Sequence, residues 1–201
     1  AVRSTLVGGS AAPPAMIEGF RTRHNIPVMH AWGMTEMSPI GTLARVKRSL
    51  AEGATEAQLL KVKSTQGYPA PLVEIRHVDD ENNVLPWDGQ TMGELEVRGP
   101  WVAASNYNND EQQDKFTPDG WFRTGDIVTI DSEGYIKITD RSKDVIKSGG
   151  EWISTVALEN ALMAHPAVLE AAVFAARNAR WDERPLAAVV FKDGKSATKD
   201  E

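Results

Sequence analysis

Two patterns of hydrophobic and polar positions divide the chain. In its first part, apolar runs at residues 2–8 and 26–31 flank an amphipathic helix that begins at Pro13-Pro14. A strand, a helix and a strand joined by short connections are typical of a parallel α/β sheet, whose ligands bind beyond the carboxyl ends of the strands. The sequence therefore predicts a parallel βαβ element with Gly8-Gly9-Ser10 and residues 33–36 at its ligand-binding edge.

From residue 72 onward the pattern changes to short strands with alternating side chains. An exposed helix at residues 51–63 and a turn-rich connection at residues 67–71 are expected first. Strands are then predicted at residues 72–78, 93–98, 127–130 and 135–139. Alternation over such short runs is typical of antiparallel sheets. A small antiparallel β subdomain is therefore expected to follow the βαβ element.

The last part of the chain combines a hairpin, a helix and two strands. A charged stretch at residues 140–144 precedes a hairpin that turns at Ser148-Gly149-Gly150. Ser154 is expected to cap the following helix, because a serine side chain accepts hydrogen bonds from free backbone N–H groups. Two strands are predicted after it, at residues 167–175 and 186–191. The predicted inward face of the helix consists of Leu158, Ala161 and Leu162.

Composition and charge narrow the possible functions. The 201 residues include 22 basic and 28 acidic side chains, so the formal net charge is -6 with histidine neutral. Because this acidity provides no basic face for a phosphate backbone, we expect no nucleic-acid partner. The chain has no cysteine, which excludes disulfides, thiolate zinc sites and cysteine nucleophiles. No apolar run approaches the roughly 20 residues that cross a bilayer, and we expect no transmembrane segment and a cytoplasmic location.

A first candidate for chemistry is Gly-Met-Thr-Glu at residues 33–36. Gly33 allows close approach to the backbone, the Thr35 hydroxyl can donate to a phosphate oxygen, and the Glu36 carboxylate can hold Mg²⁺. Trp32, just before, offers a flat face for a purine ring. The alternative is a plain turn with a capping threonine and a surface glutamate.

Two further segments carry candidate residues. Asp126 ends the string Gly-Trp-Phe-Arg-Thr-Gly-Asp and can accept hydrogen bonds from two ribose hydroxyls, unless it is only a turn aspartate. In the stretch of residues 140–153, Arg141 can bind ribose or phosphate oxygens and Lys147 adds a compact cation. The alternative here is a solvated charged linker, although this stretch runs directly into a glycine-rich hairpin.

The order of five strings gives the chain a family resemblance. They are Gly-Gly-Ser-Ala at residues 8–11, Gly-Met-Thr-Glu, Gly-Glu-Leu-Glu-Val-Arg-Gly at 93–99, Gly-Trp-Phe-Arg-Thr-Gly-Asp at 120–126, and the run at 140–154. In this order they resemble the acyl-adenylate-forming superfamily of acyl-CoA synthetases, luciferases and peptide-synthetase adenylation domains. Residues 85–89, 147–154 and 181–185 are most similar to fatty-acyl-CoA ligases, particularly those acting on medium chains.

The resemblance implies a two-step reaction with ATP, Mg²⁺ and coenzyme A. A fatty acid carboxylate attacks the α-phosphate of ATP to give acyl-adenylate and pyrophosphate, and the thiol of coenzyme A then displaces AMP. Such chemistry depends on positioning and on neutralising charge. The first part of the chain would then bind the nucleotide: the resemblance implies that Gly9, Ser10, Ala11 and Trp32 enclose the adenine, that Thr35 binds the α-phosphate and that Glu36 holds Mg²⁺.

For the second part, the resemblance implies roles at the ribose and at coenzyme A. Asp126 and Arg141 would bind the ribose, and Lys143 would be the pivot of a domain rotation between the two half-reactions. Lys147 would then face the active site in the thioester-forming arrangement. The thiol arm of coenzyme A would pass beside Gly149, Gly150 and Trp152.

The resemblance also implies the fold and the domain organisation. The fold class expected is α/β plus α+β, with residues 1–139 as the C-terminal portion of the large domain, 140–144 as a hinge linker and 145–201 as part of the small domain. The family's upstream phosphate loop and its C-terminal catalytic lysine do not appear in the sequence, and Gly194-Lys195 is not assigned to the latter. We therefore expect a fragment that is inactive alone, with no exchange of pyrophosphate into ATP.

Two alternatives belong to other functional classes. One is an adenylation domain that loads a carrier protein. The turn at residues 149–152 argues against this alternative, because it favours free coenzyme A as the acceptor. The other is a non-catalytic homologue that binds nucleotide or acyl-CoA without turnover.

The four histidines lie apart without the spacing of metal ligands, so no zinc-type site is expected.

Overall fold

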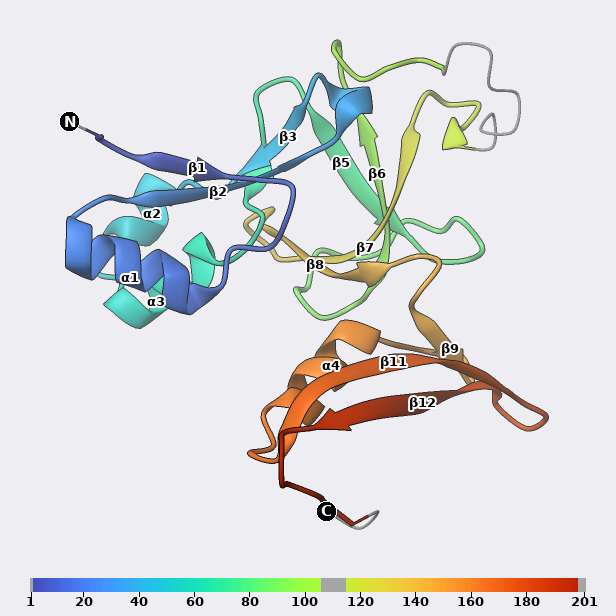
Figure 1. Cartoon of the computed structure of the whole chain (residues 1–201). Coiled ribbons are helices and arrows are strands. Elements are labelled where there is room, and N and C mark those ends of the chain that lie inside the picture. Colours follow the sequence, from blue (N-terminus) through green and yellow to red (C-terminus); the bar gives the residue numbers. More distant parts are fainter. Residues whose placement is uncertain (1, 106–114, 199–201) are drawn as a thin grey trace. The chain divides into compact units, whose positions relative to one another are not determined.

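The structure is a computed structural model that describes residues 2–105 and 115–198. It divides into two compact units (Figure 1). The first contains Ala1–Thr124 and Val128–Ile138, and the second contains Gly125–Ile127 and Thr139–Glu201. Each unit is described separately below. The predicted division into a large domain up to residue 139, a hinge at residues 140–144 and a small domain from residue 145 stays a prediction.

The first unit begins with the predicted parallel βαβ element. Strand β1 (Thr5–Val7), helix α1 (Pro14–His24) and strand β2 (Val28–Gly33) follow one another, and β1 pairs with β2 in parallel. Pro14 occupies the first turn of α1, where its missing N–H costs nothing, and the helix ends at Asn25 in the left-handed conformation. Ile17 packs with Ala12 and Val28, which fixes the helix against the sheet. This part of the expected fold is confirmed.

Two strands of the same sheet were not predicted. Strand β3 (Ile40–Leu43) pairs antiparallel with β2, and β4 (Tyr68–Pro69) pairs antiparallel with β3, so the order is β1-β2-β3-β4. The prediction of one helix at residues 51–63 was wrong in its extent. Helix α2 (Arg48–Ala51) and helix α3 (Glu56–Lys63) are separate, because Gly53 has a positive φ and Thr55 starts α3 with a capping box.

The largest core of the first unit lies on a second sheet, whose last two strands also include residues of the second unit. The strands of this sheet are β5 (Glu74–Val78), β6 (Gly93–Arg98), β7 (Phe122–Ile130) and β8 (Ile136–Arg141), in the order β5-β6-β7-β8. The antiparallel pairing expected here is confirmed for β5 and β6. Strand β7 is longer than predicted, and Leu72, with φ 68°, lies before β5 instead of in it. The core cluster includes Met37, Leu95, Val97, Phe122, Val128 and Ile130.

The second unit has the predicted hairpin, helix and strands. It consists of β9 (Ile146–Ser148), β10 (Glu151–Ile153), α4 (Thr155–Met163), β11 (Val168–Asn178) and β12 (Asp182–Phe191), with the sheet order β10-β9-β12-β11. Ser154 caps α4 as predicted, and its hydroxyl oxygen accepts from the Ala157 N–H at 3.1 Å. Leu158 and Leu162 are half-buried, but Ala161 is exposed, so its predicted inward position was wrong.

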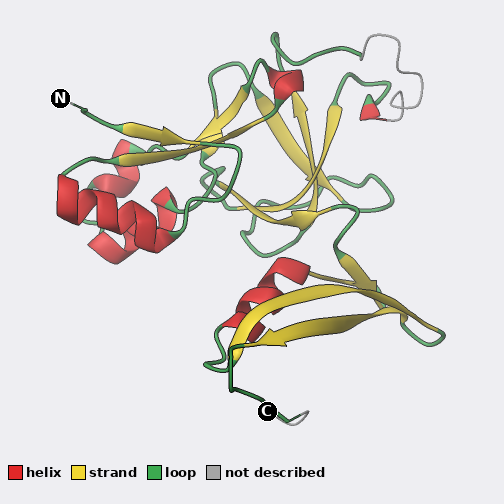
Figure 2. Cartoon of the chain, viewed as in Figure 1, coloured by secondary structure: helices red, strands yellow, loops and turns green. Residues whose placement is uncertain are grey.

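Strands β11 and β12 form a long antiparallel pair (Figure 2). Val168 and Val173 of β11 are buried. On the alternate positions, Phe174 and Leu186 pair across the two strands and are 48% and 50% exposed. In the described part of the chain, no helix is long and apolar enough to span a membrane.

The buried His77 of β5 makes the stability of the first unit depend on pH. Its side chain is fully buried, and burial lowers the pKa of the imidazole below its usual value, although the hydrogen bond with the Thr91 carbonyl opposes this. The unfolded chain therefore binds a proton more readily than the folded one. We expect the free energy of unfolding in urea to decrease as the pH falls below about 6.5.

Two variants, His77→Gln and His24→Gln, test whether this pH dependence comes from His77. His77→Gln should make the free energy of unfolding less dependent on pH over this range, because the group that titrates differently in the two states is gone. His24→Gln changes an exposed histidine and should leave the dependence as it is in the unmodified chain. An unchanged pH dependence in His77→Gln would contradict the prediction.

Candidate functional site

The loop after β1 holds the first group of candidate residues. Gly9, with φ 81°, Ser10 and Ala11 come one residue after the end of the strand at Val7. His30 in the neighbouring strand β2 is buried, and its Nε2 lies 3.3 Å from the Ser10 carbonyl oxygen. Because Val7 pairs with His30 in the parallel register, this loop and the end of β2 occupy the same edge of the sheet. This is the edge at which parallel sheets bind ligands.

The end of β2 turns sharply into the second group. A Cβ atom on Gly33 would lie 1.7 Å from the Pro39 carbonyl oxygen, so only glycine fits there. Thr35 and Glu36 then form a short 3₁₀ helix (Thr35–Met37). Its last residue, Met37, is fully buried and anchors the turn in the core.

Exposure differs among these side chains. Thr35 is exposed and Glu36 is half-buried, and the Glu36 carbonyl accepts a hydrogen bond from the Ala103 N–H at 2.7 Å. Trp32 is only 8% exposed, and its ring packs over Gly41, where an added Cβ would lie 2.5 Å from the ring. The polar groups of the turn are therefore accessible, whereas Trp32 is mainly a core residue. That Trp32 stacks on adenine stays a prediction.

The second unit brings Asp126 and Arg141 together. The Arg141 Nη1 atom lies 2.6 Å from Asp126 Oδ1. The Asp126 side chain is 4% exposed and that of Arg141 is 56% exposed, so one partner is buried and the other reaches solvent. Asp126 lies within β7, so the alternative of a turn aspartate was wrong. A buried carboxylate beside a guanidinium can accept hydrogen bonds while the cation binds a second oxygen.

The stretch of residues 140–144 is not a uniformly solvated linker. Asp140 is 4% exposed, and its Oδ2 accepts hydrogen bonds from the N–H and the hydroxyl of Thr155 at 2.6 and 2.9 Å. Its Oδ1 accepts from the Arg141 N–H at 2.8 Å. Lys143, by contrast, is exposed. That Lys143 is a pivot stays a prediction.

The hairpin of β9 and β10 places the remaining predicted residues. The Lys147 Nζ atom lies 4.9 Å from the centre of the Trp152 ring, and the Lys147 N–H donates to Glu183 Oε2 at 2.8 Å. Gly149 and Gly150, at the turn, have φ values of 60° and 87°. Trp181 was not predicted as a contact of this turn, but its carbonyl accepts a hydrogen bond from the Gly149 N–H at 3.0 Å. The only sequence signal for Trp181 was its position in residues 181–185, which resemble fatty-acyl-CoA ligases.

Alanine at the two glycines of this turn gives a matched pair of variants. A Cβ on Gly149 would lie 2.7 Å from the Trp181 ring, whereas a Cβ on Gly150 meets nothing within 4 Å. Both variants bear the cost of a left-handed backbone, and Gly149→Ala also has to displace Trp181. Gly149→Ala should lower the free energy of unfolding by about 2–3 kcal/mol and Gly150→Ala by about 1 kcal/mol. Urea denaturation measures both, and equal losses would contradict the prediction.

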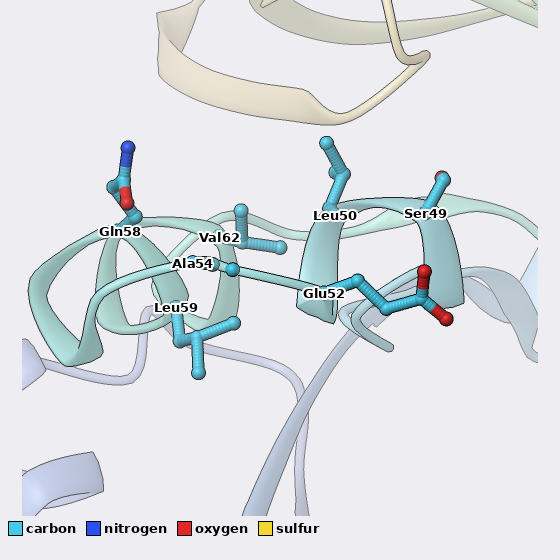
Figure 3. A pocket seen from close by; sticks show the side chains of 8 residues that line it. Ser49, Leu50, Glu52, Ala54, Gln58, Leu59 and Val62 are labelled. Atoms are coloured by element: carbon cyan, nitrogen blue, oxygen red, sulfur yellow. The ribbon is translucent and has the colours of Figure 1, made fainter.

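One cavity lies apart from the candidate residues. It has a volume of about 300 Å³ and lies between α2 and α3 (Figure 3). None of the predicted site residues lines it; the lining consists of Ser49, Leu50, Glu52, Gly53, Ala54, Gln58, Leu59 and Val62. Within residues 2–105 and 115–198, no three acidic or histidine side chains gather to hold a metal.

The structure thus assembles the predicted residues in two groups. The first unit joins Gly9–Ala11 to the turn at residues 33–36 through neighbouring strands, and the second joins Asp126 to Arg141 and Lys147 to Trp152. That both groups bind one nucleotide stays a prediction.

Comparisons with known proteins place the chain in a family. Residues 1–107 match the AMP-binding enzyme family, and residues 157–201 match the AMP-binding enzyme C-terminal domain. The chain belongs to the AMP-binding, adenylate-forming enzymes, and it contains the C-terminal part of the AMP-binding domain followed by sequence of the C-terminal domain.

Several relatives of the chain are named as CoA ligases. The chain is 48% identical to the 3-methylmercaptopropionyl-CoA ligase of Ruegeria pomeroyi over 98% of its length and 36% of the relative. It is 48% identical to the long-chain-fatty-acid–CoA ligase of Thermus thermophilus over its whole length and 37% of the relative. The o-succinylbenzoate CoA synthetase of Bacillus subtilis, solved with its acyl-adenylate intermediate, superposes with a TM-score of 0.76 at 31% identity, covering 96% of this chain and 37% of that one. The chain thus spans about a third of the length of these proteins.

Proposed function

We propose that the full-length protein is an AMP-forming acyl-CoA synthetase that joins a fatty acid to coenzyme A. The observation that carries the proposal is the accessible Thr35-Glu36 turn beside the Gly9–Ala11 loop, in a chain that belongs to the AMP-binding enzymes. Relatives named as acid–CoA ligases support the reaction class. In the first step, a carboxylate oxygen bonds to the α-phosphorus and pyrophosphate leaves. In the second, the sulfur of coenzyme A bonds to the acyl carbon and AMP leaves.

In this proposal the first unit binds the adenine and the phosphates. The Gly9–Ala11 loop and Trp32 flank the adenine, with Gly33 allowing close approach of the backbone. The Thr35 hydroxyl, which is exposed, donates to the α-phosphate. The half-buried Glu36 carboxylate fits a Mg²⁺ site, since this ion takes one or two protein carboxylates and completes its shell with waters and phosphates. Bound there, the ion supplies neutralisation of phosphate charge.

The second unit binds the ribose and prepares the thioester step. Asp126 accepts from the ribose hydroxyls, and Arg141, held by Asp126 at 2.6 Å, donates to the sugar or phosphate oxygens. Lys143 is the pivot of the small domain. Lys147, stacked on Trp152, and the Gly149-Gly150 turn face coenzyme A in the second half-reaction. Because Gly149 lies against Trp181, a side chain there would displace the turn.

The proposal also specifies the class of acid that the enzyme joins to coenzyme A. The relatives named above are ligases for a sulfur-containing short acid and for long-chain fatty acids. Similarity of residues 147–154 and 181–185 to fatty-acyl-CoA ligases favours a fatty acid, with medium chains first. Steady-state assays of the full-length protein with short-, medium- and long-chain acids, ATP, Mg²⁺ and coenzyme A test this. We expect AMP and acyl-CoA in equal amounts, with the highest kcat/KM for a medium-chain acid.

Other results of the same assays would contradict the proposal. Adenylation of amino acids, or transfer to a carrier protein in place of coenzyme A, would indicate a different adenylation enzyme. Nucleotide binding by calorimetry without any turnover would indicate a non-catalytic homologue.

A further inference from the structure

Asp140 is a buried carboxylate that connects two parts of the second unit. It lies at the end of β8, next to Arg141, and is 4% exposed. Its Oδ2 accepts from the backbone N–H of Thr155 at 2.6 Å and from the Thr155 hydroxyl at 2.9 Å, and Oδ1 accepts from the Arg141 N–H at 2.8 Å. Thr155 is itself 5% exposed. Both carboxylate oxygens therefore accept hydrogen bonds, Oδ2 from Thr155 and Oδ1 from Arg141.

A second contact lies directly beside this one. The Ser154 hydroxyl donates to the Thr139 carbonyl oxygen at 2.6 Å. The end of β8 is thus bonded to the N-terminus of α4 through the N-cap residue Ser154 and the first helical residue Thr155. A carboxylate at a helix N-terminus satisfies a free N–H and interacts favourably with the helix dipole. Here the same carboxylate also orders the backbone of the segment that carries Arg141.

The other end of this connection is the pair of Asp126 and Arg141. The Arg141 guanidinium contacts Asp126 at 2.6 Å, and the Ser142 N–H donates to the Gly125 carbonyl at 2.9 Å. Arg141 is consequently held at its backbone by Asp140 and at its side chain by Asp126. Any displacement of the α4 N-terminus that breaks the bonds to Asp140 also loosens the backbone of Arg141.

We propose that Asp140 is a positioning residue that couples the Asp126–Arg141 pair to helix α4. The inference rests on the proposed function, in which this pair binds the ribose of ATP. Lys143 lies between Asp140 and Thr155 in the sequence, so the bonds of Asp140 and Ser154 span the proposed pivot. A rotation at Lys143 has to break them, and the ribose pair and the position of α4 therefore change together.

Steady-state kinetics of the full-length protein test the coupling to the nucleotide. Asp140→Asn cannot accept hydrogen bonds on both oxygens, and it should raise the KM for ATP about tenfold in pyrophosphate exchange, with the KM for the fatty acid unchanged. Thr155→Val removes one hydroxyl contact and should raise the same KM about threefold. The double variant should be no worse than Asp140→Asn, because both act through one contact.

A matched control separates positioning from stability alone. Thr55→Val removes the N-cap of α3 in the first unit, where the Thr55 hydroxyl oxygen accepts from the Gln58 N–H at 3.3 Å. It should lower the melting temperature and leave the KM for ATP unchanged. If Asp140→Asn and Thr155→Val likewise lower only the melting temperature, the positioning role is wrong.

Amide hydrogen exchange distinguishes failure of this inference from failure of the proposed function. Thr155→Val should speed exchange at the amides of Arg141 and Ser142, although neither residue was changed. If these amides exchange at the unmodified rate in Thr155→Val, the inference is overturned even in an active enzyme. If they exchange faster but the unmodified full-length protein forms no acyl-adenylate, the coupling stands and the proposed function fails.

Discussion

Glu36→Gln in the full-length protein is expected to lower kcat for acyl-adenylate formation by about 100- to 1000-fold. Glutamine keeps the size of the side chain but removes the charge that would hold Mg²⁺ beside the phosphates. The 3₁₀ turn should stay in place, because Met37 anchors it in the core and the Glu36 backbone carbonyl binds the Ala103 N–H. Pyrophosphate exchange measures the loss, and excess Mg²⁺ should restore part of it.

The control for this variant is Glu52→Gln. Glu52 is an exposed glutamate after α2 that pairs only at the surface with Arg48, at 3.3 Å. Its replacement removes the same charge from the same unit and should leave kcat within about twofold. A Glu36→Gln enzyme with nearly full activity would exclude Glu36 as the metal ligand.

Asp126→Asn is expected to lower kcat/KM for ATP by about 30- to 100-fold. The variant removes a buried charged acceptor and leaves the Arg141 guanidinium without the partner that orients it. If the carboxylate binds ribose hydroxyls, the loss depends on those hydroxyls. The unmodified enzyme should therefore prefer ATP over 2′-deoxy-ATP or 3′-deoxy-ATP, and Asp126→Asn should have little of this preference left.

Comparing ATP with the two deoxynucleotides distinguishes ribose binding by Asp126 from a purely structural role. A merely structural Asp126 would lower activity with ATP and with both deoxynucleotides by the same factor. Equal factors would mean that the Asp126–Arg141 pair stabilises the second unit without contacting the sugar.

The parallel βαβ element and the hairpin could be predicted from the sequence because their signals are local. Pro13-Pro14 marks the start of α1, and Ser148-Gly149-Gly150 marks the turn between β9 and β10. Strand β3 had no such signal, since Gly41 is a poor strand residue and Pro39 directly precedes the strand. Its place beside β2 is compatible with Gly41, which lets the Trp32 ring pack closely over the backbone, and this contact between two strands is not visible in the local sequence pattern.

The candidate site was predictable in its residues but less so in their surroundings. Asp126 and Arg141 were expected to act together, and the structure pairs them. The charges at residues 140–144 were typical of a solvated segment, yet Asp140 is buried because α4 offers it an N–H and a hydroxyl. Sequence spacing could not indicate this, since Thr155 lies on the far side of the hairpin. The contact of Trp181 with Gly149 was not predicted either, because the two residues lie far apart in the sequence.

Strand β7 supplies residues to both compact units, since Gly125–Ile127 belong with the second and the residues on either side with the first. A protein truncated after Ile138 would keep this strand but remove Arg141, the ion-pair partner of Asp126, and Ser142, which binds the Gly125 carbonyl. A protein starting at Thr139 would lack Asp126 altogether. Separate expression of the two halves is therefore the wrong route to nucleotide-binding fragments, and limited proteolysis should be aimed elsewhere than at this strand.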